Sequence, residues 1–302
     1  MNVKASPQKV WFDGVMTDLA DARIPLLTHS LFYGSAVFEG IRCYSTSKGP
    51  AIFRLEEHIH HLFHSAKVMG MVPPYTEAEI VRAIIDVVKQ NNFDQCYIRP
   101  IFFYGEKMDL IPLGAPLHIA IAAWQWGKYL AGETVAVKVS PYIRLHPHSS
   151  EMSAKISGNY ANSILALLNA KKDGFDKALF LDADDCIAEG AGENIFFVEG
   201  KSLHTPTDRA ILPGITRASV MQIATDLGYK VVERDISINE MPRFSEVFFT
   251  GTAAEVNAIG KINGHVFNDM HEGPVVREIK SVYQRAVHGE DKRYLAWLYP
   301  VL

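Results

Sequence analysis

Long hydrophobic runs are missing from this sequence. The longest apolar stretch, HIAIAAW at residues 118–124, is too short to cross a bilayer, which takes about 20 residues. The first residues, MNVKASPQKVWFDG, have no apolar core of the kind found in signal peptides. The sequence therefore predicts neither a membrane-spanning helix nor a secretory leader.

Cysteine and one-signed charge are also scarce. The three cysteines, Cys43, Cys96 and Cys186, are odd in number and form no CxxC pair, which is typical of reduced thiols in a cytoplasmic protein. The net charge is only −4, and no block of lysine and arginine occurs. We therefore expect a cytoplasmic protein that binds neither nucleic acid nor an anionic membrane.

Repeats and low-complexity segments are absent as well, which excludes solenoids. The 302 residues, of which 48% are hydrophobic, suffice for two domains with separate cores. The more polar stretch WGKYLAGET predicts their connection. We expect a smaller N-terminal α/β domain over residues 1–126, a connection over 127–135 and a larger C-terminal domain over 136–302.

The first 125 residues or so mix strand and helix patterns. Asp13-Gly14 predicts a tight turn inside KVWFDGVMTD, and the β-branched and aromatic runs VFEGIRCY and CYIRPIFFY predict strands. Apolar residues at helical spacing predict helices in LEEHIHHLFHSAKVMG and TEAEIVRAIIDVVKQNN. Thr76 and Glu79 have the spacing of a capping box at the start of the second helix.

Helices and strands alternate in the remaining chain, which predicts an α/β domain with mixed sheets. The predicted helices are NYANSILALLNAKKDG, ITRASVMQIATDLGY and PVVREIKSVYQRAVHG, and the predicted strands are KALFLD, NIFFVEG, KVVERDI and EVFFTG.

Lys155 is placed unusually, among small residues in SAKISGNYANSI and directly before a predicted apolar helix. A lysine that attacks a carbonyl must lose its proton, and surroundings without other charges favour that loss. An exposed loop lysine would fit the same local pattern. The choice between these two interpretations depends on companion residues elsewhere in the chain.

Glu189 is the first companion, since small residues bracket it in AEGAGENIF just before a predicted strand. Small neighbours let a ligand approach the backbone closely. A carboxylate at such a position can keep a pyridine nitrogen protonated, which a carbanion-stabilising cofactor requires. A solvent-exposed turn glutamate is the alternative.

Two further stretches share the features of an anion site. LPGITR places Ile215 and Thr216 at a helix start, and TGTAAE places Gly251 and Thr252 at a strand end before a helical turn. Backbone N–H groups and a hydroxyl at such positions bind anions, aided by the helix dipole. Each stretch alone is compatible with an ordinary helix cap, but both together indicate a phosphate clamp.

Read in order, AKISGNY, EGAGENIF, LPGITR and FTGTAAE resemble the class IV aminotransferases, which bind pyridoxal 5'-phosphate in the fold type IV arrangement. LFYGSAVFEGIRCY, IFRLEEHIHHLFHSAK and YIRP in the N-terminal half agree, so the resemblance covers nearly the whole chain. It is strongest to the bacterial branched-chain amino acid aminotransferases. The resemblance implies the two-domain fold of D-amino acid aminotransferase, with the cofactor at the domain interface.

The resemblance also implies roles for cofactor-binding residues. Lys155 would bind the cofactor covalently and move the substrate proton as general base and acid. Glu189 would pair with the pyridinium nitrogen, and Tyr160 would hydrogen-bond the phenolic oxygen. The phosphate would be held by Arg54, Ile215, Thr216 and Thr252, and Leu212 and Gly251 would also belong to the cofactor site.

Substrate recognition follows from the same resemblance. Tyr97 and Arg99 are two apart on a predicted strand, so both side chains lie on one face. In the family these positions hold the carboxylates of glutamate or 2-oxoglutarate, and the Gly251-Thr252-Ala253 turn presents backbone donors to the α-carboxylate. The apolar pocket would be lined by Phe38, Trp126 and Tyr129, with Tyr33 from a neighbouring subunit.

Tyr33 therefore implies a homodimer at least, or a larger assembly such as a hexamer. One stretch departs from the family pattern: relatives of the enterobacterial type carry a Met-Gly-Val-like loop where this chain has Met108, Asp109 and Leu110. The acidic residue in place of glycine leaves the preferred amino donor open.

Other activities remain as alternatives. D-amino acid aminotransferase, (R)-amine transaminase and aminodeoxychorismate lyase would use the same lysine, glutamate and phosphate clamp, although Tyr97, Arg99 and FEGIRCY favour the branched-chain group. A metal-binding protein is the alternative from another class, since His60 and His64 are four apart on a predicted helix. No HExxH motif accompanies them, and we expect no metal.

Overall fold

The computed structural model describes residues 8–125 and 132–301. The chain divides into two compact units, of which unit 1 comprises Met1–Gly127, Ala154–Gly158 and Ala286–Leu302. Unit 2 comprises Lys128–Ser153 and Asn159–Arg285. The C-terminal domain predicted over 136–302 included the stretches 154–158 and 286–302, which belong to unit 1. Lys155 is therefore a residue of unit 1, whereas Glu189 is a residue of unit 2.

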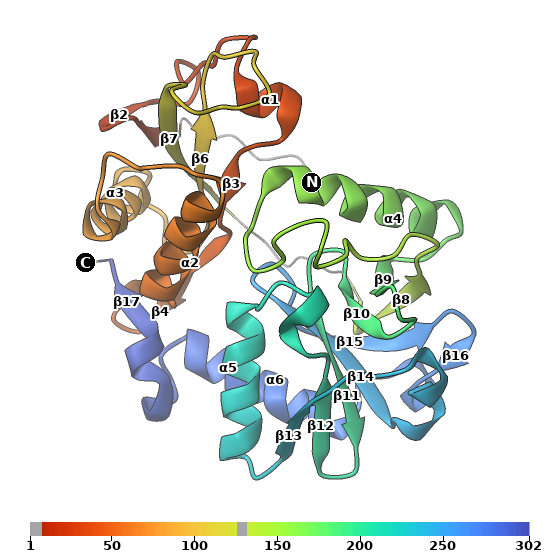
Figure 1. Cartoon of the computed structure of the whole chain (residues 1–302). Helices are drawn as coiled ribbons and strands as arrows, with labels where there is room; N and C mark the ends of the chain where they lie inside the picture. The colour runs from red at the N-terminus through yellow and green to blue at the C-terminus, as the bar shows by residue number, and fades with distance from the viewer. Residues whose placement is uncertain (1–7, 126–131, 302) are drawn as a thin grey trace. The chain divides into compact units, whose positions relative to one another are not determined.

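Unit 1 contains a sheet of antiparallel neighbours with the order β17-β5-β4-β6-β7-β1-β2, and β3 pairs with β6 (Figure 1). Its strands are β1 Lys9–Phe12, β2 Val15–Asp18, β3 Val37–Phe38, β4 Ile41–Thr46, β5 Gly49–Phe53, β6 Cys96–Tyr104, β7 Leu117–Trp124 and β17 Leu298–Pro300.

The predicted hairpin at Asp13-Gly14 is confirmed. Phe12 of β1 pairs with Val15 of β2, which leaves a two-residue loop. Asp13 has a φ of 46° and Gly14 a φ of 93°, the positive values that such a tight turn requires.

Two helices cover one face of this sheet. Helices α2 (Leu55–Val68) and α3 (Glu77–Gln90) bury Leu55, Ile59, Ile80 and Ile84 against strand residues such as Ile98. The predicted capping box starts α3: the Thr76 side chain accepts from the Glu79 N–H, and the Glu79 side chain accepts from the Thr76 N–H. The side chains of Arg42, Tyr97 and Arg99 lie on the other face of the sheet, because side chains alternate along a strand. A short helix, α1 (His29–Tyr33), and the 3₁₀ helix η5 (Lys292–Trp297) complete the unit.

The single strand predicted in VFEGIRCY is two strands, β3 and β4, separated by Glu39 and Gly40. Gly40 packs closely at this break, since a Cβ on it would lie 2.0 Å from the Tyr97 hydroxyl oxygen. Glu39, beside it, directs its buried carboxylate to histidines of α2. The interruption of the strand therefore brings a charged group into the interior of the unit.

Unit 2 contains a mixed sheet with the order β10-β9-β8-β15-β14-β11-β12-β13, and β16 pairs with β15. The pairs β8·β9, β8·β15 and β12·β13 are parallel, so the predicted α/β class with mixed sheets is confirmed. Its strands are β8 Thr134–Val139, β9 Lys177–Leu181, β10 Ile187–Gly190, β11 Asn194–Glu199, β12 Ser202–Thr205, β13 Lys230–Glu233, β14 Glu246–Gly251, β15 Glu255–Ile262 and β16 His265–Val266.

The predicted helices of this region are present as α4 (Tyr160–Lys172), α5 (Ile215–Asp226) and α6 (Pro274–Val287), which ends in unit 1. Helix α4 buries its small residues, among them Ala166 and Ala170, against Phe180 of β9, and leaves Leu168 64% exposed. Short 3₁₀ helices are η1 Ser157–Asn159, η2 Asp208–Ala210, η3 Ile238–Arg243 and η4 Asn268–Met270. Across the described residues, no helix combines the length and the apolar character needed to cross a membrane.

Candidate active site

Lys155 is held by its backbone within unit 1. Its carbonyl oxygen accepts from the Phe38 N–H at 3.2 Å, and its own N–H donates to the Ser65 Oγ of α2 at 3.0 Å. The side chain is partly buried, and its Nζ lies 5.7 Å from the centroid of the Phe38 ring. The predicted reactive lysine is therefore not an exposed loop residue. Its backbone is fixed to a strand on one side and to a helix on the other.

The substrate-binding residues predicted on β6 lie beside the same ring. The Arg99 guanidinium carbon is 4.7 Å from the Phe38 ring centroid and 5.3 Å from the Tyr97 ring centroid. Arg99 Nη2 donates a long hydrogen bond of 3.4 Å to the Tyr97 hydroxyl, while its buried Nε has no hydrogen-bond partner among the described residues. A buried donor without an acceptor is costly, and a ligand carboxylate would satisfy it.

Arg54, predicted to bind phosphate, begins α2 in an unusual backbone conformation. Its φ of 52° lies in the left-handed region, which a non-glycine residue rarely adopts. The Arg54 N–H donates to the Trp297 carbonyl at 2.7 Å, and the guanidinium lies over the Trp297 ring. Arg54 Nε is also 2.5 Å from Glu57 Oε1. An anion bound by Arg54 would therefore have to compete with Glu57.

Tyr33 is at the end of α1 and is 44% exposed. Its hydroxyl donates to the Met108 carbonyl at 3.2 Å, so it contacts the loop that departs from the family pattern. Asp109 in that loop is exposed, with its carboxylate 3.7 Å from Lys107 Nζ. Lys107 Nζ also donates to the Leu113 carbonyl at 2.6 Å, which closes the loop.

In unit 2, Glu189 on β10 is buried, with an exposed fraction of 5%. Arg144 Nε donates to its Oε1 at 2.8 Å, and the Leu212 N–H donates to its Oε2 at 3.2 Å. The carboxylate is therefore paired with a permanent cation inside the unit. The alternative of a turn glutamate in solvent is wrong for this residue.

Asn194, which sequence reasoning did not single out, connects Glu189 with the LPGITR stretch. Its Nδ2 donates to Glu189 Oε2 at 3.1 Å and to the Leu212 carbonyl at 2.9 Å. A Cβ on Gly214 would lie 2.1 Å from Asn194 Oδ1, so only glycine fits there. The amide thus fixes the distance between the predicted partner of the ring nitrogen and the predicted phosphate clamp. Asn194 stands inside the quoted motif EGAGENIF, but neither its spacing nor its residue type indicated this contact.

The predicted clamp residues Ile215 and Thr216 are the first two residues of α5, as expected. Gly214 caps the helix without a side-chain hydrogen bond, so the first N–H groups stay available to a ligand. Thr216 is 2% exposed, and the first intrahelical bond runs from the Ala218 N–H to the Gly214 carbonyl. This helix terminus has the donors that an anion requires.

The helical turn predicted after Gly251 is wrong. Strands β14 and β15 instead form a hairpin, in which Gly251 pairs with Glu255 across a turn of residues 252–254. Thr252 and Ala253 occupy the turn, and their N–H groups lie outside the ladder. A Cβ on Gly251 would lie 3.3 Å from the Gly192 carbonyl oxygen, so this turn packs against the loop that follows Glu189.

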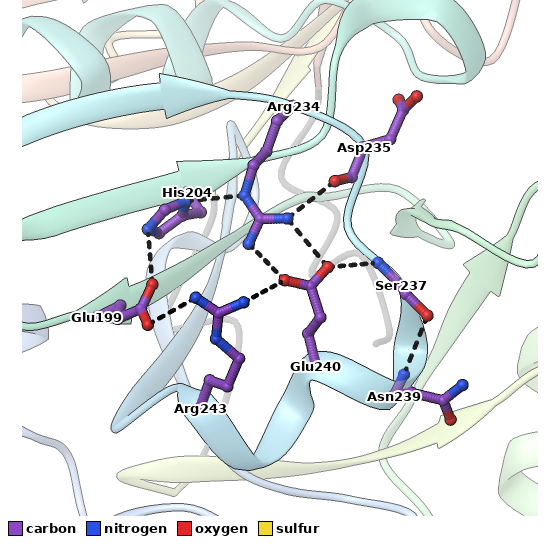
Figure 2. A network of polar contacts seen from close by, with 8 residues as sticks. All are labelled: Glu199, His204, Arg234, Asp235, Ser237, Asn239, Glu240 and Arg243. Atoms are coloured by element: carbon purple, nitrogen blue, oxygen red, sulfur yellow. Dashed lines mark hydrogen bonds and ion pairs between the residues drawn. The ribbon is translucent and has the colours of Figure 1, made fainter.

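The free edge of β10, the strand that carries Glu189, is covered by residues 236–237. The Ile187 N–H donates to the Ile236 carbonyl at 2.8 Å, and Cys186 forms a bridge with Ser237. Figure 2 shows the polar network that holds this segment: Arg234 donates to both carboxylate oxygens of Glu240, and Glu240 also accepts from the Ser237 N–H.

Three predicted residues have less structural support. Tyr160, predicted to hydrogen-bond the phenolic oxygen, is the first residue of α4 and is partly buried. Trp126 and Tyr129, predicted to line the apolar pocket, lie outside the described residues.

The metal-binding alternative finds no support. His60 is exposed and lies 3.4 Å from Glu77 Oε1, and His64 is exposed with its ring stacked on His61. Within residues 8–125 and 132–301, no group of three or more histidine, cysteine, aspartate or glutamate side chains could hold a metal ion.

The donors and acceptors of this chain fit pyridoxal 5'-phosphate. Unit 2 provides a buried carboxylate for a ring N–H, and a helix N-terminus for a phosphate. Unit 1 provides Lys155 and a buried arginine nitrogen, Arg99 Nε, to which no described residue offers an acceptor.

Comparison with known proteins gives the same assignment. The family described as amino-transferase class IV matches residues 36–262. The branched-chain-amino-acid aminotransferase of Pseudomonas aeruginosa is 41% identical over 293 residues, which is 95% of each chain. The enzyme of the same name from Escherichia coli K12 is 36% identical over 296 residues, which is 96% of each chain.

Solved structures agree over nearly the full length. The branched-chain amino acid aminotransferase of Escherichia coli has a TM-score of 0.95 at 36% identity, covering 98% of this chain and 100% of that one. The branched-chain aminotransferase of Thermoproteus uzoniensis with norvaline has a TM-score of 0.94 at 40% identity, covering 98% of this chain and 99% of that one. Since the family match exceeds half of the chain and the relatives cover nearly all of it, this chain belongs to the class IV aminotransferases, which use pyridoxal 5'-phosphate.

Proposed function

We propose that this chain transfers the amino group of leucine, isoleucine or valine to 2-oxoglutarate, giving the branched-chain 2-oxo acid and L-glutamate, with pyridoxal 5'-phosphate as cofactor. Relatives with this named activity are 36% to 41% identical over nearly the whole chain. No described contact favours one of the sister activities over this one.

The observation that carries the proposal is the position of Arg99 between two aromatic rings, those of Phe38 and Tyr97. Aromatic rings suit the apolar side chain of leucine, whereas the buried Nε of Arg99 suits the side-chain carboxylate of 2-oxoglutarate. Both substrates of the exchange can therefore use one pocket. Lys155 Nζ is 5.7 Å from the centroid of the same Phe38 ring, which supports its proposed role beside the bound substrate.

The chain's own groups then have defined tasks. When bound, the cofactor supplies an electron sink for the pair left by breaking the Cα–H bond. Lys155 Nζ would hold the cofactor covalently until the amino group of the substrate displaces it; the freed amine would then take the proton from Cα as general base and later return a proton as general acid. Glu189 accepts the hydrogen bond from the protonated ring nitrogen and so keeps the positive charge there. Tyr160 donates to the phenolic oxygen.

The phosphate is assigned to Arg54, to the N–H groups of Ile215 and Thr216, and to the hydroxyls of Thr216 and Thr252. The helix dipole of α5 favours a dianion at this terminus. Backbone N–H groups of the turn at Gly251, Thr252 and Ala253 are assigned to the substrate α-carboxylate. Leu212 contributes by holding Glu189 through its N–H.

The assembly that we propose is a homodimer at least, in which Tyr33 completes the apolar pocket of the neighbouring subunit together with Trp126 and Tyr129. Large apolar side chains are exposed around Tyr33: Leu31 at 56%, Phe32 at 53%, Leu110 at 75% and Ile111 at 65%. Exposed apolar side chains that gather in one region mark interfaces. The reduced cysteines suit the cytoplasmic location that we infer.

A substrate panel tests the function. The holoenzyme is mixed separately with L-amino acids, D-amino acids and (R)-amines, and the visible absorption of the cofactor is followed before and after 2-oxoglutarate is added. We expect leucine, isoleucine and valine to convert the cofactor most rapidly. Conversion by D-amino acids or (R)-amines alone would replace the proposal with a sister activity.

Arg99→Ala tests dual recognition. We expect kcat/KM for 2-oxoglutarate to fall at least about 100-fold, because a bidentate charged pair is lost, while kcat/KM for leucine falls less than about 10-fold. Arg82→Ala, which removes an exposed arginine of α3, is the matched control and should change neither value. Equal losses for both substrates would contradict the role of Arg99.

A further inference from the structure

Glu39 is a buried carboxylate to which the proposed reaction gives no task. It lies between β3 and β4 and is 2% exposed. Its N–H donates to the Pro100 carbonyl at 3.0 Å, and one carboxylate oxygen accepts from the Gly40 N–H at 3.1 Å. Its chain neighbour Phe38 carries the ring against which Lys155 and Arg99 both lie. A charge buried this deeply requires a reason, because burial of an unpaired carboxylate is costly.

Two histidines of α2 hold this carboxylate. His58 Nδ1 lies 2.8 Å from Oε2, and His61 Nδ1 lies 2.5 Å from Oε1. The two histidines are three residues apart on the helix, so both rings reach the same side. An ionised carboxylate only accepts hydrogen bonds, hence each histidine must carry a proton on Nδ1. With both rings neutral, the cluster of Glu39, His58 and His61 has one net negative charge.

Lys155 lies near that charge, since its carbonyl oxygen accepts from the N–H of Phe38, the residue before Glu39, and its Nζ is 5.7 Å from the centroid of the Phe38 ring. Burial by itself would raise the pKa of Glu39, yet its pKa lies far below the ordinary value, because the charge of Lys155 and the hydrogen bonds from His58 and His61 outweigh burial. A coulombic interaction acts equally on both partners. The Glu39 carboxylate therefore favours the protonated form of the nitrogen on Lys155.

The backbone couples the same groups mechanically. Ser65 Oγ accepts from the Lys155 N–H and donates to the His61 carbonyl at 2.9 Å. The Lys155 carbonyl accepts from Phe38, the residue before Glu39. The lysine is thus attached to the two elements that hold the carboxylate, α2 on one side and the end of β3 on the other.

Other charged groups lie on the neighbouring elements, and Arg99 shares the Phe38 ring with Lys155. On β6, the Arg99 guanidinium lies over Phe38 and Tyr97, and on β4, Arg42 lies over the Tyr44 ring. At the start of α2, Arg54 pairs with Glu57, and further along, His64 stacks on His61. The buried residues that α3 contributes to this core are apolar: Ile80, Val81, Ala83, Ile84, Val87 and Val88.

We propose that Glu39, clamped by His58 and His61, is a positioning residue that supplies the counter-charge for the nitrogen of Lys155 and so keeps that nitrogen protonated in the resting enzyme. The inference rests on the proposed function, in which this nitrogen forms the covalent link to the cofactor. Protonation makes the linked carbon more electrophilic, which favours attack by the amino group of the incoming substrate.

A spectroscopic pH titration of the holoenzyme tests this inference without relying on turnover. The visible absorption of the cofactor reports the protonation of the nitrogen that links it to Lys155. We expect Glu39→Gln to lower the pKa of that nitrogen by about one to three, the range for loss of a nearby opposite charge. Glu39→Asp, which keeps the charge but shortens the side chain, should restore much of the difference.

His60→Gln is the matched control, because His60 is on the same helix but exposed and near Glu77. It should leave the titration unchanged. Identical pKa values in Glu39→Gln and the wild type would overturn the inference while leaving the proposed function intact. If the wild type bound no pyridoxal 5'-phosphate through Lys155, the proposed function itself would fail.

A second measurement decides the matter if Glu39→Gln does not fold. Side-chain ¹⁵N spectra of histidine are compared between the wild-type holoenzyme and Lys155→Ala loaded with pyridoxal 5'-phosphate. Both spectra should show Nδ1 protonated in His58 and His61, and removal of the Lys155 charge should move these two signals but not that of His60. Protonation on Nε2 alone, or unchanged His58 and His61 signals, would overturn the inference.

Discussion

Glu39 in unit 1 and Glu189 in unit 2 are both buried carboxylates, but they are held by different donors. Glu39 accepts from two histidines, which can be neutral, whereas Glu189 accepts from the permanently charged Arg144 and from the Asn194 amide. The charge of Glu189 is therefore balanced by a residue with no proposed reactive role. The pKa of Glu39 is instead lowered by the charge of Lys155, the proposed reactive residue itself, and by the hydrogen bonds from His58 and His61.

This difference shows that burial alone does not define the role of a carboxylate. A carboxylate whose charge is already paired with an arginine, such as Glu189, can accept a hydrogen bond from a protonated ligand nitrogen and does not act on the proton affinity of a reactive side chain. A carboxylate paired with a reactive amine acts on the proton affinity of that amine. Substitutions that remove one charge at a time separate the two cases.

The largest effect is expected from Glu189→Gln. The amide cannot stabilise a positive charge on the ring nitrogen, so kcat should fall by about 10²–10³-fold, the range for losing one preorganised electrostatic partner. Single-turnover absorption changes with leucine measure the step. Glu199→Gln, on β11, the next strand along the chain, is the control. A wild-type rate with bound cofactor would show that Glu189 does not have this task.

The second effect concerns the stability contributed by Glu39. Because its folded-state pKa is lowered, its stabilisation is fully present above the unfolded pKa of about 4.3 and is lost as the pH falls below that value. Glu39→Gln should cost about 3 kcal/mol in the free energy of unfolding at pH 7.

Urea unfolding at pH 7 and at pH 3 to 4 checks the sign. The wild type should lose its advantage over Glu39→Gln as the solution becomes more acidic. A difference that stays constant over this range would mean that Glu39 is not ionised against Lys155 in the folded protein.

A smaller effect is expected from Asn194→Ala. Glu189 keeps Arg144 and the Leu212 N–H, but the Leu212 carbonyl loses its donor, and the turn before α5 loosens. We expect affinity for pyridoxal 5'-phosphate to fall about 10-fold, equal to ~1.4 kcal/mol. Equilibrium dialysis measures it, with the exposed Asn239→Ala as control. Unchanged affinity would mean that the contacts of Asn194 with Glu189 and Leu212 do not support binding of the phosphate.

The smallest effect belongs to the network in Figure 2. Arg243 pairs with Glu199 and Glu240, but its side chain is 58% exposed. Exposed ion pairs contribute little, so Arg243→Ala should lower the free energy of unfolding by less than about 1 kcal/mol and leave kcat unchanged. Thermal unfolding and steady-state kinetics measure both quantities. A large loss of activity would mean that residues 236–237, which cover the edge of β10, affect the position of Glu189.

The elements that sequence predicted well are those specified by local chemistry. Asp13-Gly14 required its turn, and Thr76 with Glu79 required its capping box, because both depend on residues close in the chain. Lys155 and Glu189 were predicted as site residues because motifs of a known family carry them. Their partners Glu39, His58 and Asn194 were not found, since each acts through contacts between distant chain segments that leave no local pattern. The turn at Gly251 was misread because glycine and small residues suit helix starts and hairpins equally.

The central claim is that the Lys155 amine binds the cofactor. Reduction of the holoenzyme with borohydride, followed by digestion and mass spectrometry of the peptides, tests it most directly. We predict a phosphopyridoxyl group on the peptide that contains Lys155 and none on the peptide that contains the buried Lys177. Modification of another lysine, or of none while the cofactor is bound, would contradict the account.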